Sequence, residues 1–556
     1  MTEKGYITME NKKMAELLLP NIDKTPDYYE NLYPERNLPE GAKVTRLGPS
    51  PTGFIHLGNL FGAITDERLA HLSDGVFYLR IEDTDNKREV EGAVDVVINT
   101  LRYFGVEFDE GATSDGEKGD YGPYRQRQRA EIYQTFAKWL IERGMAYPCF
   151  CTEDELAAMR EKQTELKENF GYYGKWAVHR NITFEEAKKN IDEGKPYVIR
   201  FRAPENTGKT FTIEDGIRGE LTMPENEQDV VILKSDGIPT YHFAHVIDDH
   251  LMRTTHVVRG EEWLATLPIH VQLFEAMGWK APIYCHTAQL MKIDGGVKRK
   301  LSKRKDPELS LDYYKSEGYL PGAVWEYLMT VLNSNYEQWR MDNPDKDVKE
   351  FEFTTKKMGI SGSLFDIDKL NDVSKNYLAT LDSETVYNYI TEWAKECDEE
   401  YYDLLTRDKD FSLGMIAIGR GGEKPRKDIS HWKQSKDFYS FFFDELFKME
   451  DSFPENVSEE DRKAILTKYM ETYDHSDDQQ TWFSKVRALG EELGYAPQPK
   501  LYKKKPESYK GHVGDVSGVI RVAITGRTNS PDIWCIQQVL GEKRSMERIR
   551  KAYEQK

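Results

Sequence analysis

The segment Val44–Gly62 reads VTRLGPSPTGFIHLGNLFG and decides the fold. Its first four residues include two β-branched side chains and favour a strand. The prolines and glycines that follow can neither continue this strand nor form a helix, so they predict a turn. Beyond the turn, apolar Leu57, Leu60 and Ile64 recur at helical spacing. The segment therefore predicts a strand, a turn and a helix whose first unpaired N–H groups attract phosphate.

The length and composition bound the class of protein. A chain of 556 residues is too long for one hydrophobic core and predicts about three or four domains. Five cysteines are too few and too unevenly spaced for a disulfide framework. No apolar run is long enough to cross a membrane, and the N-terminus lacks the pattern of a signal peptide. We expect a soluble, cytoplasmic protein with reduced thiols and no membrane partner.

The charge is unevenly distributed. A formal net charge of −19 argues against a protein that coats nucleic acid indiscriminately. Residues 481–556, however, carry 15 Lys and Arg against 8 Asp and Glu. A polyanion can bind such an end, although a basic tail is as often only a solvated surface. Charge alone does not decide between these two interpretations.

Strands and helices alternate on both sides of a less regular stretch. Residues 75–82 predict a strand that ends at Glu82, and an apolar helical pattern follows up to Leu101. The alternation weakens over residues 148–229, which we interpret as an insertion. Regular alternation resumes with a strand at residues 230–234 and continues to a strand at residues 282–287. The pattern predicts a parallel α/β sheet that binds its ligands at the carboxyl ends of the strands.

Two short motifs flank this region and are the strongest candidates for chemistry. In the first, HLGN, His56 at a helix start can donate to the phosphates of ATP, and Gly58 lets a flat base lie on the backbone. In the second, KLSKR, Lys303 can neutralise charge on a displaced pyrophosphate. Each motif alone is common by chance, since a basic loop is usually only solvated. Here HLGN follows a predicted strand and the PSPTG turn, and KLSKR comes later in the chain. Chance is a poor explanation for both motifs in this order.

These motifs carry a resemblance to a known family. PSPTGFIHLGN resembles the "HIGH" signature of the class I aminoacyl-tRNA synthetases, and KLSKR resembles their "KMSKS" loop. Together TRLGPSPTG, FYLRIEDTD, LKSDGIPTYHFAHVIDDH and RGEEWLATLPIH are similar to the bacterial-type glutamyl-tRNA synthetases. The resemblance runs from about residue 43 to residue 306 with high specificity. It continues more loosely to the C-terminus, where RVAITGRTNSPDIWCIQQVLG resembles the family's last anticodon-binding segment.

The resemblance implies a domain order: a Rossmann-like parallel-sheet catalytic domain, split by an acceptor-binding insertion and followed by an all-α C-terminal anticodon-binding region. The expected boundaries are residues 1–40 for an N-terminal appendage of unread function, 41–147 for the first half of the catalytic domain, 148–229 for the insertion, 230–309 for the second half with the KLSKR loop, 310–380 for a stem-contact helical domain and 381–556 for the anticodon-binding domain.

The resemblance also implies a reaction. Glutamate would attack the α-phosphate of ATP, bound with Mg²⁺, and the glutamyl group would pass to the terminal ribose of tRNA(Glu). No covalent enzyme intermediate is needed, so catalysis would rest on positioning and electrostatic stabilisation. The family pattern gives the catalytic residues as His56, Ser302 and Lys303, and the ATP-binding residues as His56, Gly58, Asn59, Lys300, Leu301 and Lys303. Asn59 stands where the signature has its second histidine, and an amide can still donate a hydrogen bond.

The amino-acid pocket is carried over in the same way. The family pattern gives its residues as Arg46, Ser50, Glu82, Tyr241, His245 and Arg259. Arg46 and Arg259 match the arginines that engage the side-chain carboxylate, where a planar guanidinium favours bidentate pairing. An unpaired buried arginine is costly, so two arginines favour glutamate over glutamine. Without the family pattern, each arginine would be interpreted as part of a surface ion pair.

One departure from the family concerns zinc. Some members bind zinc in the insertion through Cys-x-Cys and a later Tyr-x-x-x-Cys. Cys149 and Cys151 supply the first pair, but Trp176 stands where the next cysteine would fall, and His179 is the nearest substitute. A closed zinc site needs four ligands. We therefore expect no bound zinc.

Several alternatives remain open. The enzyme can charge only tRNA(Glu) or also tRNA(Gln), and the chain can be a catalytically inactive paralogue that only binds tRNA. A truncated relative that glutamylates a modified nucleoside lacks the roughly 250 residues that follow Asp306 here. A glutaminyl enzyme has a β-barrel C-terminal region in the family pattern, whereas this one predicts helices. We expect an active monomer whose partners are glutamate, ATP and tRNA.

Overall fold

The computed structural model describes residues 7–51, 53–85, 90, 92–205 and 207–555, so Thr52 of the opening segment and the first six residues lie outside the described part. Two units divide the chain. The first comprises Met1–Tyr313 and Trp325–Asp366, and the second comprises Tyr314–Val324 and Ile367–Lys556. No helix within the described ranges is long and apolar enough to cross a lipid bilayer.

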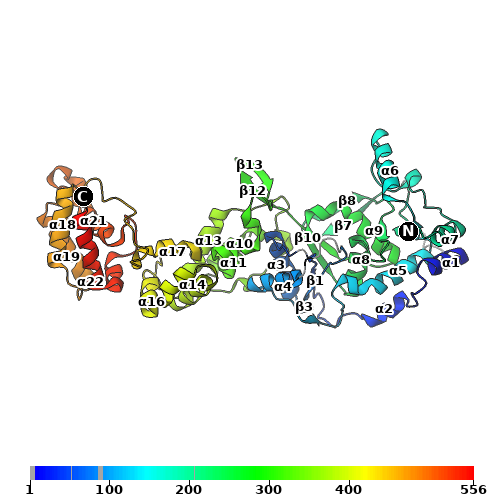
Figure 1. The fold of residues 1–556 in the computed structure, drawn as a ribbon, viewed down its shortest axis with the longest axis horizontal. Coiled ribbons are helices and arrows are strands. Elements are labelled where there is room, and N and C mark those ends of the chain that lie inside the picture. The colour runs from blue at the N-terminus through cyan, green and yellow to red at the C-terminus, as the bar shows by residue number, and fades with distance from the viewer. Residues whose placement is uncertain (1–6, 52, 86–89, 91, 206, 556) are drawn as a thin grey trace. The chain divides into compact units, whose positions relative to one another are not determined.

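The opening segment forms the elements that its composition predicts. Strand β1 (Val44–Leu47) leads through the turn into helix α3 (Leu57–His71). The predicted apolar stripe of Leu57, Leu60 and Ile64 is fully buried. β1 pairs in parallel with β2 (Val76–Leu79), and β2 pairs in parallel with β3 (Glu110–Thr113) (Figure 1). The carboxyl ends of these strands lie at one edge, which is where the turn begins.

A second set of parallel strands lies beside β1. β10 (His256–Gly260) pairs in parallel with β11 (Ile283–Thr287), and Arg259 stands opposite His286. The backbone N–H of Thr255 donates to the carbonyl of Val44 at 2.9 Å, which ties the start of β10 to β1. Helix α9 (Leu267–Met277) connects β10 to β11, and its Leu267 packs in one cluster with Val257 and Tyr284. Helix α8 (Tyr241–Leu251) precedes β10 and packs against α9. The α/β alternation predicted for this region is present.

The insertion has more strands than the sequence indicates. β7 (Thr210–Asp215) and β8 (Gly219–Pro224) form a hairpin that reaches β11 through the pair Asp215 and Tyr284. The expectation that residues 230–234 resume the catalytic sheet is wrong. That strand, β9 (Val231–Leu233), instead pairs antiparallel with β6 (Val198–Phe201), which pairs with β5 (Ala146–Cys149). The sequence pattern missed this placement because β9 pairs with a strand, β6, that is not its neighbour in the sequence.

The N-terminal residues pack along the first unit. Helix α1 (Met9–Leu18) lies against α5 (Ala130–Glu142) and α7 (Phe184–Asp192), and α2 (Pro26–Leu32) also contacts α5. Two hydrogen bonds add to this packing, from Lys138 Nζ to Ile22 O at 2.7 Å and from Tyr197 OH to Leu18 O at 2.9 Å. Glu30 also pairs with His250 and Arg253, and Arg36 pairs with Glu110. The segment set aside as an appendage is thus anchored to both halves of the catalytic region.

The basic KLSKR region is partly a hairpin. β12 (Leu290–Asp294) pairs antiparallel with β13 (Val297–Lys300), and β14 (Ser363–Leu364) extends β12 on its other side. Gly295 and Gly296 form the turn with φ values of 56° and 83°, which side-chain-bearing residues rarely adopt. The two glycines therefore form the tight tip of a strand pair, and KLSKR begins at Lys300, the last residue of β13.

Helices make up the second unit, as expected. Its C-terminal part packs helices α18 (Glu459–Thr472), α19 (Gln479–Glu492), α21 (Val513–Thr525) and α22 (Ile533–Glu554) against one another (Figure 1). α22 bends at Gly541, whose φ is 79°. The remaining helices that lie wholly in this unit are α13 (Ile367–Thr380), α14 (Ser383–Cys397), α15 (Glu399–Thr406), α16 (Lys409–Ala417), α17 (Trp432–Phe438) and α20 (Pro499–Lys504).

Candidate active site

The turn after β1 presents the start of helix α3. His56 precedes the helix, and its Nδ1 accepts the backbone N–H of Asn59 at 3.2 Å. In return, Asn59 Oδ1 accepts the backbone N–H of His56 at 3.1 Å. This reciprocal capping box holds the imidazole over the first helical turn. A Cβ at Gly58 would lie 3.0 Å from two ring atoms of His56, so the glycine leaves room for the ring.

The capping box also defines the protonation of His56. Because Nδ1 accepts a hydrogen bond, the neutral ring carries its proton on Nε2. Burial, and then the ammonium groups of Lys303 and Lys300, lower the pKa of His56, although Glu262 opposes them. At pH 7 the side chain is therefore neutral and offers one N–H, from Nε2.

Lys303 lies at the same helix start. Its Nζ is 3.8 Å from the centre of the Phe54 ring, and that ring centre is 6.1 Å from the centre of the His56 ring. The HLGN and KLSKR motifs, which are far apart in the sequence, thus meet at one place. Their positive charge and the free N–H of His56 make a site suited to an anionic phosphate chain.

Asp306 fixes the loop that carries Lys303. Its carboxylate accepts hydrogen bonds from Nη1 and Nη2 of Arg299 at 2.7 and 2.8 Å and from the backbone N–H of Ser302 at 2.8 Å. The Arg299 hydrogen bonds are the main reason that the pKa of Asp306 falls well below its usual value. Leu301 is buried beneath the loop, whereas Lys300 at the end of β13 is exposed. The backbone of Ser302 is therefore held by Asp306, and a role of Ser302 in shaping the loop stays a prediction.

The predicted amino-acid residues come together beside this site. Arg46 on β1 and Arg259 on β10 are both buried, with 4% and 8% of their surface exposed. Tyr241 begins helix α8, and its pKa is raised by burial first and by Glu82 next, while Arg259 and Arg46 oppose the rise. One phenol thus lies within electrostatic reach of two guanidinium groups and one carboxylate, which is the charge pattern that an amino-acid dicarboxylate needs.

Neighbouring groups hold the side chain and backbone of Glu82 in position. Its Oε1 accepts a hydrogen bond from Arg80 Nη2 at 3.0 Å, and its backbone N–H donates to the carbonyl of Pro49 at 3.0 Å. A Cβ at Gly48 would lie 2.7 Å from Cδ of Glu82 and overlap Oε1. Burial raises the pKa of Glu82, while Arg80 and Arg46 oppose this rise. The glycine at position 48 and the arginine at position 80 together orient this carboxylate.

His245 and Ser50 differ in their surroundings. His245 is fully buried, with Nδ1 2.6 Å from Asp249 Oδ2 and Nε2 3.0 Å from the hydroxyl of Tyr284. Both ring nitrogens therefore face protein groups, and the ring stacks on that of Tyr241, 5.7 Å away. Ser50 lies in the turn after β1 and is exposed. Their roles toward a substrate stay predictions.

Several buried charged residues around this pocket have no role predicted from the sequence. Asp249 lies 2.5 Å from Nη1 of Arg80 and 3.4 Å from Nε of Arg46, and these cations lower its pKa strongly against the effect of burial. Asp249 thus supplies the charge that permits Arg46 and Arg80 to be buried. The IDDH stretch that contains Asp249 is part of the resemblance to the glutamyl-tRNA synthetases, but only the strand arrangement reveals the partners of Asp249.

A cysteine-rich cluster lies in the insertion. Sγ of Cys151 is 3.3 Å and Sγ of Cys149 is 3.8 Å from Nδ1 of His179. The hydroxyl of Tyr172 lies 3.4 Å from Sγ of Cys149 and 3.6 Å from Sγ of Cys151. The ligands of a tetrahedral zinc ion are about 3.3–3.8 Å apart, given the usual zinc–ligand bond lengths. The ligand atoms of Cys149, Cys151 and His179 all lie within 4.8 Å of one another, so these three residues could hold a metal ion, with the hydroxyl of Tyr172 beside them. The expectation of no bound zinc awaits a metal analysis.

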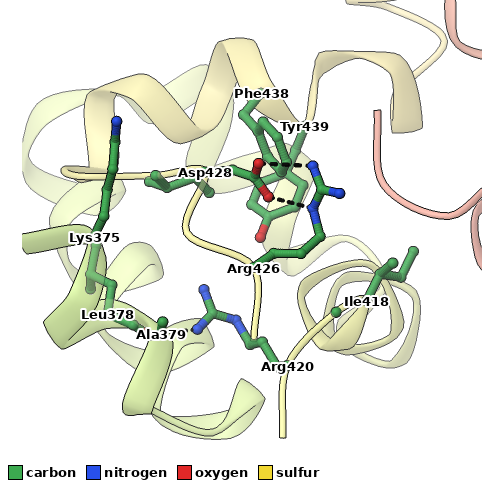
Figure 2. Close-up of a pocket in the computed structure, with 11 residues that line it drawn as sticks. Lys375, Leu378, Ala379, Ile418, Arg420, Arg426, Asp428, Phe438 and Tyr439 are labelled. Atoms are coloured by element: carbon green, nitrogen blue, oxygen red, sulfur yellow. Dashed lines mark hydrogen bonds and ion pairs between the residues drawn. The ribbon is translucent and has the colours of Figure 1, made fainter. Parts of the chain in front are cut away.

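The second unit has a separate pocket between α13, α16 and α17. Figure 2 shows Arg420 and Arg426 on its wall, with the guanidinium of Arg426 paired to the carboxylate of Asp428 at 2.6 and 2.8 Å. Arg420 donates from Nε to the carbonyl of Ile416 and from Nη1 to that of Leu378, at 3.1 and 2.7 Å. Both arginines of the glycine-rich stretch at residues 419–426, GRGGEKPR, are thus bound to protein groups and brace this loop.

A helix start with an HxGN motif at the edge of a parallel sheet, facing a basic KLSKR loop, defines the class I aminoacyl-tRNA synthetases. Comparison with known families agrees with this class. Residues 43–372 match the model of the tRNA synthetases class I (E and Q), catalytic domain, and residues 429–553 match that of an anticodon binding domain.

Similar proteins narrow the family. A glutamate--tRNA ligase of Acetivibrio thermocellus is 60% identical over 98% of this chain and all of its own length, and one of Clostridium perfringens is 51% identical over 97% of this chain. The crystal structure of a glutamate tRNA ligase from Elizabethkingia meningosepticum, in complex with its amino acid, covers 92% of this chain with 28% identity and a TM-score of 0.75. The chain belongs to the glutamate--tRNA ligase family.

Proposed function

We propose that this chain activates glutamate with ATP and transfers the glutamyl group to the 3′-terminal ribose of tRNA(Glu). One observation carries the proposal: two buried arginines and Glu82 lie within electrostatic reach of Tyr241, and Lys303 lies at the start of helix α3. The arginines suit a carboxylate, Glu82 suits an ammonium group, and the helix start suits phosphates. The two substrates would then lie next to each other.

On the ATP side, we assign His56 and Lys303 to the phosphates. The Nε2–H of neutral His56 would donate to a phosphate oxygen, and the ammonium group of Lys303 would stabilise the charge that gathers on the leaving pyrophosphate. Lys300 adds positive charge to the same place, and Gly58 keeps the helix start open. Mg²⁺ would accompany ATP as part of the substrate.

On the amino-acid side, we assign Arg259 and Arg46 to the side-chain carboxylate and Glu82 to the ammonium group. A glutamine amide cannot satisfy two buried guanidinium groups, because it carries no negative charge. The pocket therefore supports glutamate as the substrate. Ser50, Tyr241 and His245 would complete its walls.

Glutamate-dependent exchange between ATP and pyrophosphate tests this function. The exchange is measured with and without tRNA(Glu), and with glutamine in place of glutamate. We expect exchange that requires glutamate. The absence of exchange under both conditions would instead favour an inactive paralogue that only binds tRNA.

The range of tRNA is a separate proposal. We infer that the second unit contacts the anticodon end, because residues 429–553 match an anticodon binding domain. Charging assays with purified tRNA(Glu) and tRNA(Gln) decide whether the enzyme also charges the second. We further propose a cytoplasmic monomer, and light scattering on the purified protein measures its mass against 64.6 kDa for one chain.

A further inference from the structure

Arg259 has an unusual set of partners for a buried arginine. Its Nε lies 3.0 Å from Nε2 of His286, and its Nη1 lies 3.1 Å from Nδ1 of His270. Nη2 is buried and has no hydrogen-bond partner among the described residues. No carboxylate in that part of the chain forms an ion pair with this guanidinium. Two imidazoles thus hold the cation, and one nitrogen stays available.

The two histidines must act as acceptors, because a guanidinium group can only donate. His286 then carries its proton on Nδ1, which lies 2.6 Å from Oδ2 of Asp215. His270 carries its proton on Nε2, which lies 2.9 Å from Nδ1 of His242. A continuous relay runs from Asp215 through His286, Arg259 and His270 to His242.

The fold fixes each member of this relay. His286 on β11 stands in register opposite Arg259 on β10. Asp215 ends β7, and its Oδ1 also accepts the backbone N–H groups of Ile217 and Arg218, both at 2.9 Å. His270 lies on α9 and His242 on α8. The relay therefore joins five elements, and β11 and α9 supply the two contacts to the guanidinium.

The relay keeps Arg259 charged and free for a ligand. A carboxylate in direct contact would neutralise the guanidinium and compete with an incoming carboxylate, as two anions would share one cation. Neutral imidazoles orient the group without such competition. Asp215, the only anion of the relay, acts through His286. Burial lowers the pKa of His286 and of His270, and the charge of Arg259 lowers both further, so both rings stay neutral at pH 7.

We infer that His286 and His270 are positioning residues for Arg259, which hold its Nε and Nη1 so that Nη2 faces the side-chain carboxylate of the substrate. This inference rests on the proposed role of Arg259 in binding glutamate. It adds two histidines and Asp215 to the determinants of substrate affinity, although none of them needs to touch the substrate.

Two matched pairs of variants test the inference. His286→Phe and His270→Leu remove the acceptor. His286→Gln and His270→Asn keep a carbonyl oxygen near the position of the lost nitrogen. In glutamate-dependent exchange with tRNA present, we expect the first pair to raise KM for glutamate about tenfold or more, with KM for ATP unchanged. The second pair restores KM to within about threefold of the wild type.

His256→Phe is the control, since His256 lies on the same strand as Arg259 and its side chain bonds only to Thr255 among the described residues. It leaves KM for glutamate unchanged. Circular dichroism and Tm check that each variant folds, and if His286→Phe does not, the His270 pair decides. An equal rise of KM for glutamate and for ATP, or no rescue by Gln and Asn, overturns the relay.

Arg259→Ala separates the relay from the proposed function. If Arg259 binds glutamate, this variant raises KM for glutamate, and adding His286→Phe to it causes no further rise. An additive loss overturns the relay and leaves the proposed function intact. An unchanged KM in Arg259→Ala itself overturns the role of Arg259, and with it the relay.

Discussion

Gly48 shows how one missing side chain determines a binding group. Glu82 occupies the space that a Cβ at position 48 would need, so the glycine and the carboxylate are structurally coupled. The sequence suggested a turn glycine, because turns commonly contain glycine. The actual reason is a close approach between two strand ends, which no local pattern reveals.

Gly48→Ala should therefore act like a substitution of Glu82. The new methyl group displaces the Glu82 carboxylate, so we expect KM for glutamate to rise about tenfold or more, as in Glu82→Gln. Steady-state exchange kinetics measure this effect. Gly62→Ala is the control, because nothing lies within 4 Å of a Cβ at that position of α3. If Gly48→Ala binds glutamate normally, Glu82 does not hold the ammonium group in the way proposed.

His245 predicts a dependence of stability on pH. Burial, opposed by Asp249, lowers its pKa to about 3. Between this value and about 6.5, the unfolded chain binds a proton that the folded chain does not, so the stability falls as the pH falls. From pH 7 to pH 5 this one residue should cost about 2 kcal/mol.

The variant His245→Asn removes this contribution. We expect its Tm to fall less between pH 7 and pH 5 than that of the wild-type protein, since other groups titrate equally in both. Thermal unfolding followed by circular dichroism gives the comparison. Equal falls in Tm would mean that His245 is protonated in the folded protein.

At the scale of elements, the cysteine cluster joins β5 to the loop that carries Tyr172 and His179. A zinc ion would replace the contacts between these side chains with four bonds and pin the loop to the strand. We expect about one zinc per chain in protein purified without chelator, measured by elemental analysis. Cys149→Ser and Cys151→Ser should lose the metal, whereas Cys397→Ser, an exposed cysteine of the second unit, should keep it. A metal-free wild-type protein would support the original expectation from sequence.

The elements differ in how far the sequence predicts them. β1, the turn and α3 follow from local composition, since proline, glycine and apolar spacing act within a few residues. The pairing of β7 with β11 and of β9 with β6 depends on hydrogen bonds between distant segments, and so the sequence pattern missed both. The residues of the site also divide into those that a local motif reveals and those that only the fold reveals. The motifs of His56 and Lys303 were visible, but His286 and His270 gain their role only from the register of β10 and β11 and from the packing of α9.

At the scale of the whole molecule, an acidic chain carries a short basic segment. The net charge is −19, yet α20 and the residue after it present the exposed lysines Lys503, Lys504 and Lys505. None of the three forms an ion pair with any described residue, so their charge is available to a polyanion. An acidic protein with a local basic surface limits stray binding to nucleic acid.

Replacing these three lysines with glutamine should weaken the interaction with tRNA. We expect kcat/KM for tRNA to fall several-fold and the dependence of its logarithm on log salt to become shallower by about 2. Charging assays at several salt concentrations measure both effects. Lys12→Gln with Lys13→Gln on α1 is the control. An unchanged salt dependence would place the tRNA elsewhere on the second unit.

The N-terminal segment has a consequence for how the protein is made. Glu30 emerges from the ribosome early, but its partner His250 lies 220 residues later in the sequence. Helix α1 is likewise synthesised before α5 and α7, the helices that it packs against. Helices α1 and α2 therefore lack these partners until the chain has been synthesised past His250. A folded tag fused directly to residue 1 would stand next to a segment that must still reach its binding surface, so the choice of fusion end should affect the yield of folded enzyme.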